Sequence, residues 1–170
     1  IEIGALGESN PIIRLLQALE RFLYHRAAKI VTVLPMAHEY ITAYGVPHDK
    51  IVWIPNGVDL TRFHSVVPST VSHQDFRIVY MGSLVRASAI EIVIQAAKIV
   101  QNKGYQEVRF ILFGSGPEKT RLISLAEKLS LRNVEFREPV AKGDVPKVLC
   151  EADATILALY ELPLYKYGIS

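Results

Sequence analysis

Cysteine is almost missing from this sequence. Cys150 is the one cysteine among 170 residues, so no disulfide can form within the chain, which fits a reducing compartment such as the cytoplasm. Cys150 stands in a helical pattern with no histidine near it in sequence. We therefore expect a small buried side chain there rather than a reactive thiol.

Long hydrophobic runs and long charged runs are also missing. The longest apolar stretches have about six residues, far fewer than the ~20 that span a bilayer, so we expect no spanning segment. The 19 Lys and Arg residues face 17 Asp and Glu, and they are scattered without a basic stripe. This pattern argues against a nucleic-acid partner.

Metal-ligand patterns are not found either. The five histidines have no ligand-like spacing with each other or with Cys150, and the sequence contains no Asp-x-Asp pair. We therefore expect neither a metal site nor a bound cofactor.

From Phe76 onward, the sequence alternates short apolar runs with helical patterns. Strands are predicted at 76–81, 108–113, 134–137 and 154–159, and helices at 88–103, 117–130 and 144–152. This alternation predicts an α/β fold, a Rossmann-like parallel sheet flanked by helices. Ligands on such sheets bind outside the carboxyl ends of the strands, here after Met81, Phe113, Arg137 and Leu159.

The first part of the chain has fewer elements. Helical patterns cover 12–28 and 35–44, strands are predicted at 29–34 and 51–55, and 64–75 has the composition of a linker. The helix at 12–28 is amphipathic and basic. Its apolar face packs against its own domain or lies on an anionic membrane, and the first alternative is the more common one.

A glycine-rich turn stands at the centre of the second part. Gly114-Ser115-Gly116-Pro117 follows a buried strand and precedes a helix, with Pro117 suited to the first helical position. Glycines let backbone amides approach a phosphate at a helix N-terminus. The turn lacks the third glycine of the dinucleotide fingerprint and the Gly-Lys-Ser/Thr of a P-loop, so an ordinary strand-to-helix turn is an equal alternative.

Several blocks together resemble one enzyme family. They are Lys50-Ile-Val-Trp-Ile-Pro-Asn-Gly-Val-Asp59, Gly82-Ser-Leu-Val, Phe113-Gly-Ser-Gly-Pro-Glu and Glu151-Ala-Asp-Ala-Thr-Ile-Leu. In order and spacing they are similar to the family-4 retaining glycosyltransferases of the GT-B fold. The tail from Leu162 to Ser170 is similar to a subgroup that builds capsule, colanic-acid and O-antigen polysaccharides, including N-acetyl-fucosamine transferases.

The resemblance implies two facing domains, one for the acceptor and one for a nucleotide sugar that is commonly UDP-linked. Residues 1–65 would be the end of the N-terminal acceptor domain, 66–75 a linker, and 76–170 a truncated C-terminal nucleotide-sugar-binding domain. The chain would then be a fragment, inactive on its own, of a cytoplasmic enzyme. A glycan or lipid-linked acceptor would place that enzyme peripherally at the inner face of a membrane.

The resemblance also assigns site residues. In the family, the loop after the first donor-domain strand presents an Arg and, five residues later, a Lys to the diphosphate. Those positions are Ser83 and Ser88 here, so Arg86 is the expected substitute, unless it is a solvated surface residue. Glu161 is the catalytic candidate, with a solvated loop carboxylate as the alternative, and the family's second acid would lie beyond Ser170. The donor-binding set is Gly82, Ser83, Arg86, Gly114, Ser115, Gly116, Arg137, Glu138, Pro139, Val140, Val145 and Tyr160, with Lys142 on the same edge and Glu138 equally a solvated carboxylate.

The implied reaction transfers a sugar from a nucleoside diphosphate to a hydroxyl with retained anomeric configuration. Two other functions stay open. A nucleotide-sugar 2-epimerase shares the GT-B architecture but needs acid and base side chains around the cleft, and no such set is seen. A non-catalytic nucleotide-binding module is supported by the missing Arg and Lys.

Overall fold

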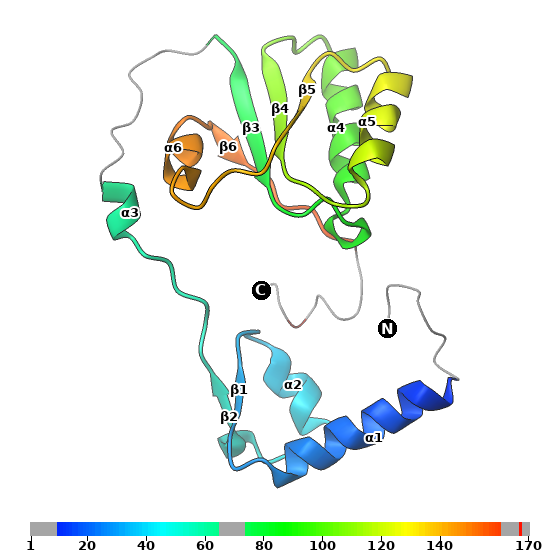
Figure 1. Cartoon of the computed structure of the whole chain (residues 1–170), viewed down its shortest axis with the longest axis vertical. Coiled ribbons are helices and arrows are strands. Elements are labelled where there is room, and N and C mark those ends of the chain that lie inside the picture. The colour runs from blue at the N-terminus through cyan, green and yellow to red at the C-terminus, as the bar shows by residue number, and fades with distance from the viewer. Residues whose placement is uncertain (1–9, 65–73, 161–166, 168–170) are drawn as a thin grey trace. The chain divides into compact units, whose positions relative to one another are not determined.

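The computed structural model describes residues 10–64, 74–160 and 167. Contacts divide these residues into two units. The first reaches to Val58 and includes Tyr167, and the second runs from Asp59 to Tyr160 (Figure 1). Each unit contains its own parallel sheet.

The first unit has a long helix and a two-stranded parallel sheet. Its elements are α1 (Pro11–Arg26), β1 (Ile30–Thr32), α2 (Ala37–Thr42), the 3-10 turn η1 (His48–Lys50) and β2 (Ile51–Trp53). Asn10 caps α1, since its side chain accepts from the Ile12 amide at 2.9 Å, and Pro11 occupies the first turn. The small core consists of Ala37, Ile41 and Val46.

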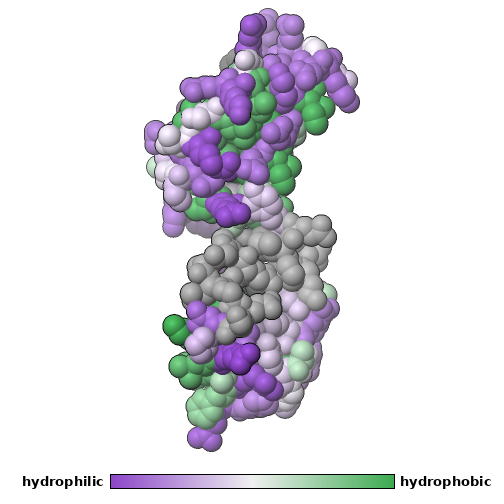
Figure 2. Space-filling view, turned by 90° about the vertical axis from the view of Figure 1, so that its right-hand side faces the viewer, coloured by the Kyte–Doolittle hydropathy of each residue, from purple (hydrophilic) through white to green (hydrophobic). Residues whose placement is uncertain are grey.

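Most apolar side chains of α1 face outward. Only Ile13 is buried in this helix, while six larger apolar residues are 49 to 69% exposed: Ile12, Leu15, Leu16, Leu19, Phe22 and Leu23. Green hydrophobic atoms are accordingly visible on the surface of the first unit, in the lower part of Figure 2. The described part of the chain therefore leaves this face uncovered.

The second unit has a four-stranded parallel sheet in the order β5-β4-β3-β6. The strands are β3 (Phe76–Met81), β4 (Val108–Phe113), β5 (Val134–Arg137) and β6 (Ala154–Thr155). The helices are α3 (Thr61–His64), α4 (Ile90–Asn102), α5 (Lys119–Lys128) and α6 (Val145–Cys150), with the 3-10 turn η2 (Arg86–Ser88) between β3 and α4. The predicted α/β class and the parallel sheet flanked by helices are confirmed.

Strand alternation sends side chains to two faces of this sheet. Tyr80, Phe110 and Leu112 pack under α4 and α5 in the main core, with Leu84 and Ile94 fully buried among them. The alternate residues face α6, which lies on the opposite side of the sheet (Figure 1). This two-sided covering is typical of doubly wound parallel sheets.

Some local expectations were wrong. Cys150 is exposed, because it ends the six-residue α6 while Val148 of that helix takes the place against the sheet. Pro117 precedes its helix by two residues, and the Glu118 amide between them donates to the Leu84 carbonyl at 3.1 Å. α4 begins only after Ala89, which has a left-handed φ of 49°.

The last strand and one short helix also differ from expectation. β6 pairs with β3 at only two positions, so the strand predicted at 154–159 is cut to two residues. No described strand lies on its other side to extend the ladder. α3, at Thr61–His64, was not predicted at all.

Candidate nucleotide site at the carboxyl edge of the second sheet

Three turns leave the carboxyl edge of the sheet side by side. The register aligns Met81 with Phe113 and Phe113 with Arg137, so the next residues, Gly82, Gly114 and Glu138, start neighbouring turns. The turns continue the ladder, because the Gly82 amide donates to the Phe113 carbonyl at 3.0 Å. The sheet thus gathers at one edge segments that are far apart in sequence, as the alternation predicted.

The glycines of the second turn are required by packing. A Cβ on Gly114 would collide with the carbonyl oxygen of Gly82, and one on Gly116 with the carbonyl oxygen of Leu84. Gly116 also has a φ of +152°, which side chains rarely allow. These glycines therefore allow the turns after β3 and β4 to be in contact. From the sequence, the glycines were expected only to let the backbone approach a phosphate.

A cavity of about 240 Å³ lies between these turns. Seven of the predicted donor-binding residues line it. Met81 and Phe113 also line it, although they were not predicted as donor-binding residues. Their position as the last residue of each strand was the signal for them. The lining residues are Met81, Gly82, Ser83, Phe113, Gly114, Ser115, Pro139, Val140 and Val145.

Among the described residues, the lining of this cavity is uncharged and offers hydrogen-bond donors. The backbone amides and the side-chain hydroxyls of Ser83 and Ser115 donate no hydrogen bond to another described residue, and the amide of Gly116 beside them donates none either. Free amides in consecutive turn positions form a concave site for an anion. The cavity therefore suits a ligand with a neutral body and an anionic group at its edge.

Charged side chains surround the turns on the α4 and α5 side. Arg121 lies between two carboxylates, 2.9 Å from Glu91 and 2.6 Å from Glu118. Hydrogen bonding to Arg121 is the main cause that lowers the pKa of Glu91, and the charge of Arg86 adds to it. Burial, followed by the nearby Glu91, raises the pKa of Tyr160. Arg86 and Tyr160 thus belong to one electrostatic group with Glu91 and Arg121. The last two residues were not predicted from the sequence.

Arg137 and Glu138 point away from the 240 Å³ cavity. Arg137 pairs with Glu135 at 2.7 Å and stacks over Phe113 with 5.4 Å to the ring centre. Glu138 pairs with Lys119 at 2.7 Å and its side chain is 84% exposed. The side chains of Arg137 and Glu138 are therefore not placed to contact a ligand in the 240 Å³ cavity.

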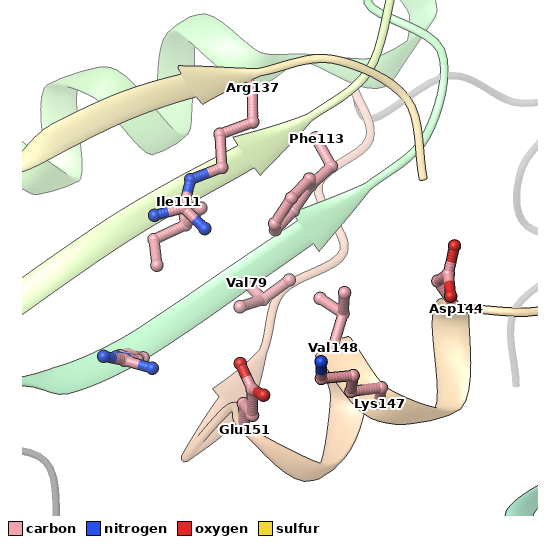
Figure 3. A pocket seen from close by; sticks show the side chains of 9 residues that line it. Val79, Ile111, Phe113, Arg137, Asp144, Lys147, Val148 and Glu151 are labelled. Carbon is pink, nitrogen blue, oxygen red and sulfur yellow. The ribbon is translucent and has the colours of Figure 1, made fainter. Parts of the chain in front are cut away.

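Arg137 instead lines a second cavity, of about 310 Å³, between the sheet and α6 (Figure 3). Val79, Ile111, Phe113 and Val148 supply its apolar surfaces, Lys147 comes from α6, and Glu151 directly follows that helix. Positive and negative side chains alternate around it, so no single charge is selected. Glu161, the catalytic candidate, lies outside the described residues.

Two further observations concern metals and membranes. Within residues 10–64 and 74–160, no three His, Cys, Asp or Glu side chains gather in a way that would hold a metal ion. None of the helices in these ranges has the length and apolar character needed to cross a bilayer.

Comparisons with known proteins point to one family. Residues 66–162 match the model described as glycosyl transferases group 1, and residues 4–62 match the model of glycosyltransferase family 4. The chain is 24% identical over 164 residues to a protein named as a colanic acid biosynthesis glycosyl transferase, WcaI, of Escherichia coli K12, covering 91% of this chain and 40% of that protein. It is 26% identical over 136 residues to a second protein of the same organism named for colanic acid biosynthesis, WcaL, covering 79% and 33%.

Solved structures agree with the fold. WaaG, a glycosyltransferase involved in lipopolysaccharide biosynthesis, superposes with a TM-score of 0.72 at 18% identity, covering 89% of this chain and 44% of its own. Anabaena Alr3699/HepE in complex with UDP and glucose gives 0.70 at 18% identity, covering 85% and 41%. The chain thus spans about two fifths of the length of WcaI, of WaaG and of HepE.

Proposed function

The chain belongs to the group 1 glycosyl transferases, and from that membership we propose that its second unit binds the nucleoside diphosphate of a sugar donor. The observation that carries the proposal is the 240 Å³ cavity at the carboxyl edge, where the amides of Ser83, Ser115 and Gly116 donate no hydrogen bond to another described residue. Rossmann-like sheets bind nucleotides at this edge, where the strand order reverses. That reversal is at β3 here, which has β4 on one side and β6 on the other.

We propose UDP as the nucleotide. The loop Glu138-Pro139-Val140 borders the cavity through Pro139 and Val140, so a small base would meet backbone groups rather than selective side chains. A structural neighbour in complex with UDP and glucose supports this choice. The phosphates would lie toward Ser83 and Gly116, and Arg86 would supply a positive charge.

We further propose that the whole protein transfers the sugar with retention to a glycan or lipid-linked acceptor of a cell-surface polysaccharide. The names of WcaI, WcaL and WaaG, which refer to colanic acid and lipopolysaccharide, support this class of acceptor. In the proposed step, the acceptor oxygen bonds to the anomeric carbon on the face that the diphosphate leaves. The departing phosphate oxygen takes the acceptor proton, and amides at the turns stabilise its charge.

The proposal also includes the cellular location of the reaction. We place it in the cytoplasm, peripherally at the inner face of a membrane, since a lipid-linked acceptor would be met there. The exposed apolar face of α1 fits either of two coverings, further parts of an acceptor domain or an anionic bilayer. Co-sedimentation of the chain with vesicles made from neutral and anionic lipid separates them, because only a bilayer covering predicts pelleting that salt reverses.

Calorimetric titration of the chain with UDP, GDP and ADP tests the donor site. Binding of UDP in preference to the other two is the expected result, and Gly114→Ala should weaken it because the turns must separate. The absence of binding by all three nucleotides would contradict the proposal. An epimerase is not favoured, because the described residues that line the cavity include no carboxylate or histidine to move a proton.

A further inference from the structure

The carbonyl oxygen of Ser83, in the turn after β3, accepts two hydroxyl hydrogen bonds. Tyr80 donates to it at 3.0 Å and Ser88 at 2.6 Å. Both donors are buried, with 5% of Tyr80 and 9% of Ser88 exposed. Ser83 itself is exposed and lines the cavity. Buried hydroxyls therefore hold the carbonyl of Ser83, while the residue itself is exposed at the cavity.

The rest of the turn is tied down at Leu84. This fully buried residue donates from its amide to the Ser115 carbonyl at 2.8 Å and accepts from the Glu118 amide at 3.1 Å. Among the described residues, the backbone from Val85 to Ala89 then makes only local turn hydrogen bonds before α4 begins. Within the part of the chain that the structure describes, the Ser88 side chain is what connects this segment to Ser83, through its hydrogen bond to the Ser83 carbonyl.

The end of the same segment is strained. Ala89 has a left-handed φ of 49°, a conformation that disfavours residues other than glycine by about 1 kcal/mol or more. Such a conformation persists only where surrounding contacts fix it. The buried Ser88 hydroxyl, next to Ala89 in sequence, is such a contact.

We propose that Ser88 is a positioning residue of the donor site, which holds the Ser83 amide and hydroxyl at the cavity so that they bind a donor phosphate. The inference rests on the proposed function. Where the family resemblance leads to an Arg and a Lys, the chain has two serines, one that faces the ligand and one that fixes the first. A neutral donor bonded to a phosphate forms a charge-assisted bond, so Ser83, held by Ser88, can take over part of the lost cation contact.

The test compares Ser88→Ala with Ser88→Thr, which keeps a hydroxyl, and with Ser124→Ala, a control on α5 outside the cavity lining. Tyr80→Phe removes the other bond to the same carbonyl. UDP and uridine are titrated into the whole chain of each variant, and amide exchange is followed in the peptide that covers 82–89. We expect Ser88→Ala to weaken UDP roughly tenfold, which corresponds to one charge-assisted bond, and to leave uridine unchanged.

The remaining outcomes each decide the matter. Faster exchange confined to 82–89 in Ser88→Ala, with Ser88→Thr and Ser124→Ala like the wild type, supports positioning by the hydroxyl. Unchanged UDP affinity, or an equal loss for UDP and uridine with faster exchange throughout the second unit, would overturn it. A wild-type chain that binds no UDP would overturn the proposed function itself, and is recognised before any variant is compared.

Discussion

The amide of Leu84 donates a hydrogen bond to the carbonyl oxygen of Ser115 at 2.8 Å, which joins the turn after β3 to the turn after β4. The two residues are far apart in sequence, and the parallel register of their strands brings them together. Because Leu84 is fully buried, the joint is anchored in the core. The candidate nucleotide site is therefore part of the folded sheet edge rather than a free loop.

Gly114→Ala tests this joint. Its Cβ would collide with the Gly82 carbonyl oxygen, so we expect a loss of about 1 to 3 kcal/mol in the free energy of unfolding, as in overpacked interiors. Gly143→Ala is the matched control, because nothing lies within 4 Å of its Cβ position. Urea denaturation followed by circular dichroism measures both. Equal stability of the two variants would contradict the packing role.

Arg86→Ala tests the proposed cation of the diphosphate site. Arg86 lies in the short η2 turn and outside the buried core, so its removal should leave the unfolding midpoint nearly unchanged while UDP affinity falls roughly tenfold. Uridine, which has no phosphate, should bind equally to both proteins. Lys103→Ala, at the far end of α4, is the control, and an equal effect from it would indicate only a general loss of positive charge.

Leu112→Ala tests where the second unit draws its stability. Leu112 is fully buried between the sheet and its helices, and we expect a cost of about 2 to 5 kcal/mol. Leu157 is 73% exposed, and Leu157→Ala should change the unfolding free energy by less than about 0.5 kcal/mol. Denaturant titration of both variants is the measurement. Similar small effects would contradict the assigned core.

Alkaline pH should weaken the first unit. Burial, followed by the hydrogen bond to Glu20 at 2.8 Å, raises the pKa of Tyr24 to about 12, and burial likewise raises the pKa of Tyr40. A raised pKa in the folded state stabilises the unit fully below about pH 10, and this contribution disappears as the pH rises toward about 12. Thermal unfolding at about pH 9 and about pH 11.5 should show the loss, and Tyr24→Phe should reduce it. A midpoint that does not change with pH would contradict this.

The sequence predicted the second unit more accurately than the first. The boundaries of β3, β4 and β5 were predicted to the residue, because each is an apolar run that a turn signal closes. The apolar face of α1 was expected to pack, yet its partner surface is not among the described residues. The spacing of apolar residues predicts which face of a helix is apolar, but it does not predict what covers that face.

The turn pattern predicted several backbone positions that line the 240 Å³ cavity, and it was less informative about the directions of long side chains. Gly82, Gly114 and Pro139 were found because turns follow strands at one edge. The direction of Arg137 depends on its partner Glu135 and on the ring of Phe113, two contacts that the turn pattern does not contain. The bond between Ser88 and Ser83 was likewise not predicted, because it depends on the path of the turn between them, which the sequence pattern does not contain.

The most direct test of the account is to map UDP binding on the backbone amides of the isotope-labelled chain by nuclear magnetic resonance. We predict that the amides of Ser83, Ser115 and Gly116 shift most, while those at the opposite edge, such as Arg109 and Arg132, keep their positions. Shifts that gather at Arg109 and Arg132, or no shifts at saturating UDP, would contradict a nucleotide site at the carboxyl edge of the sheet.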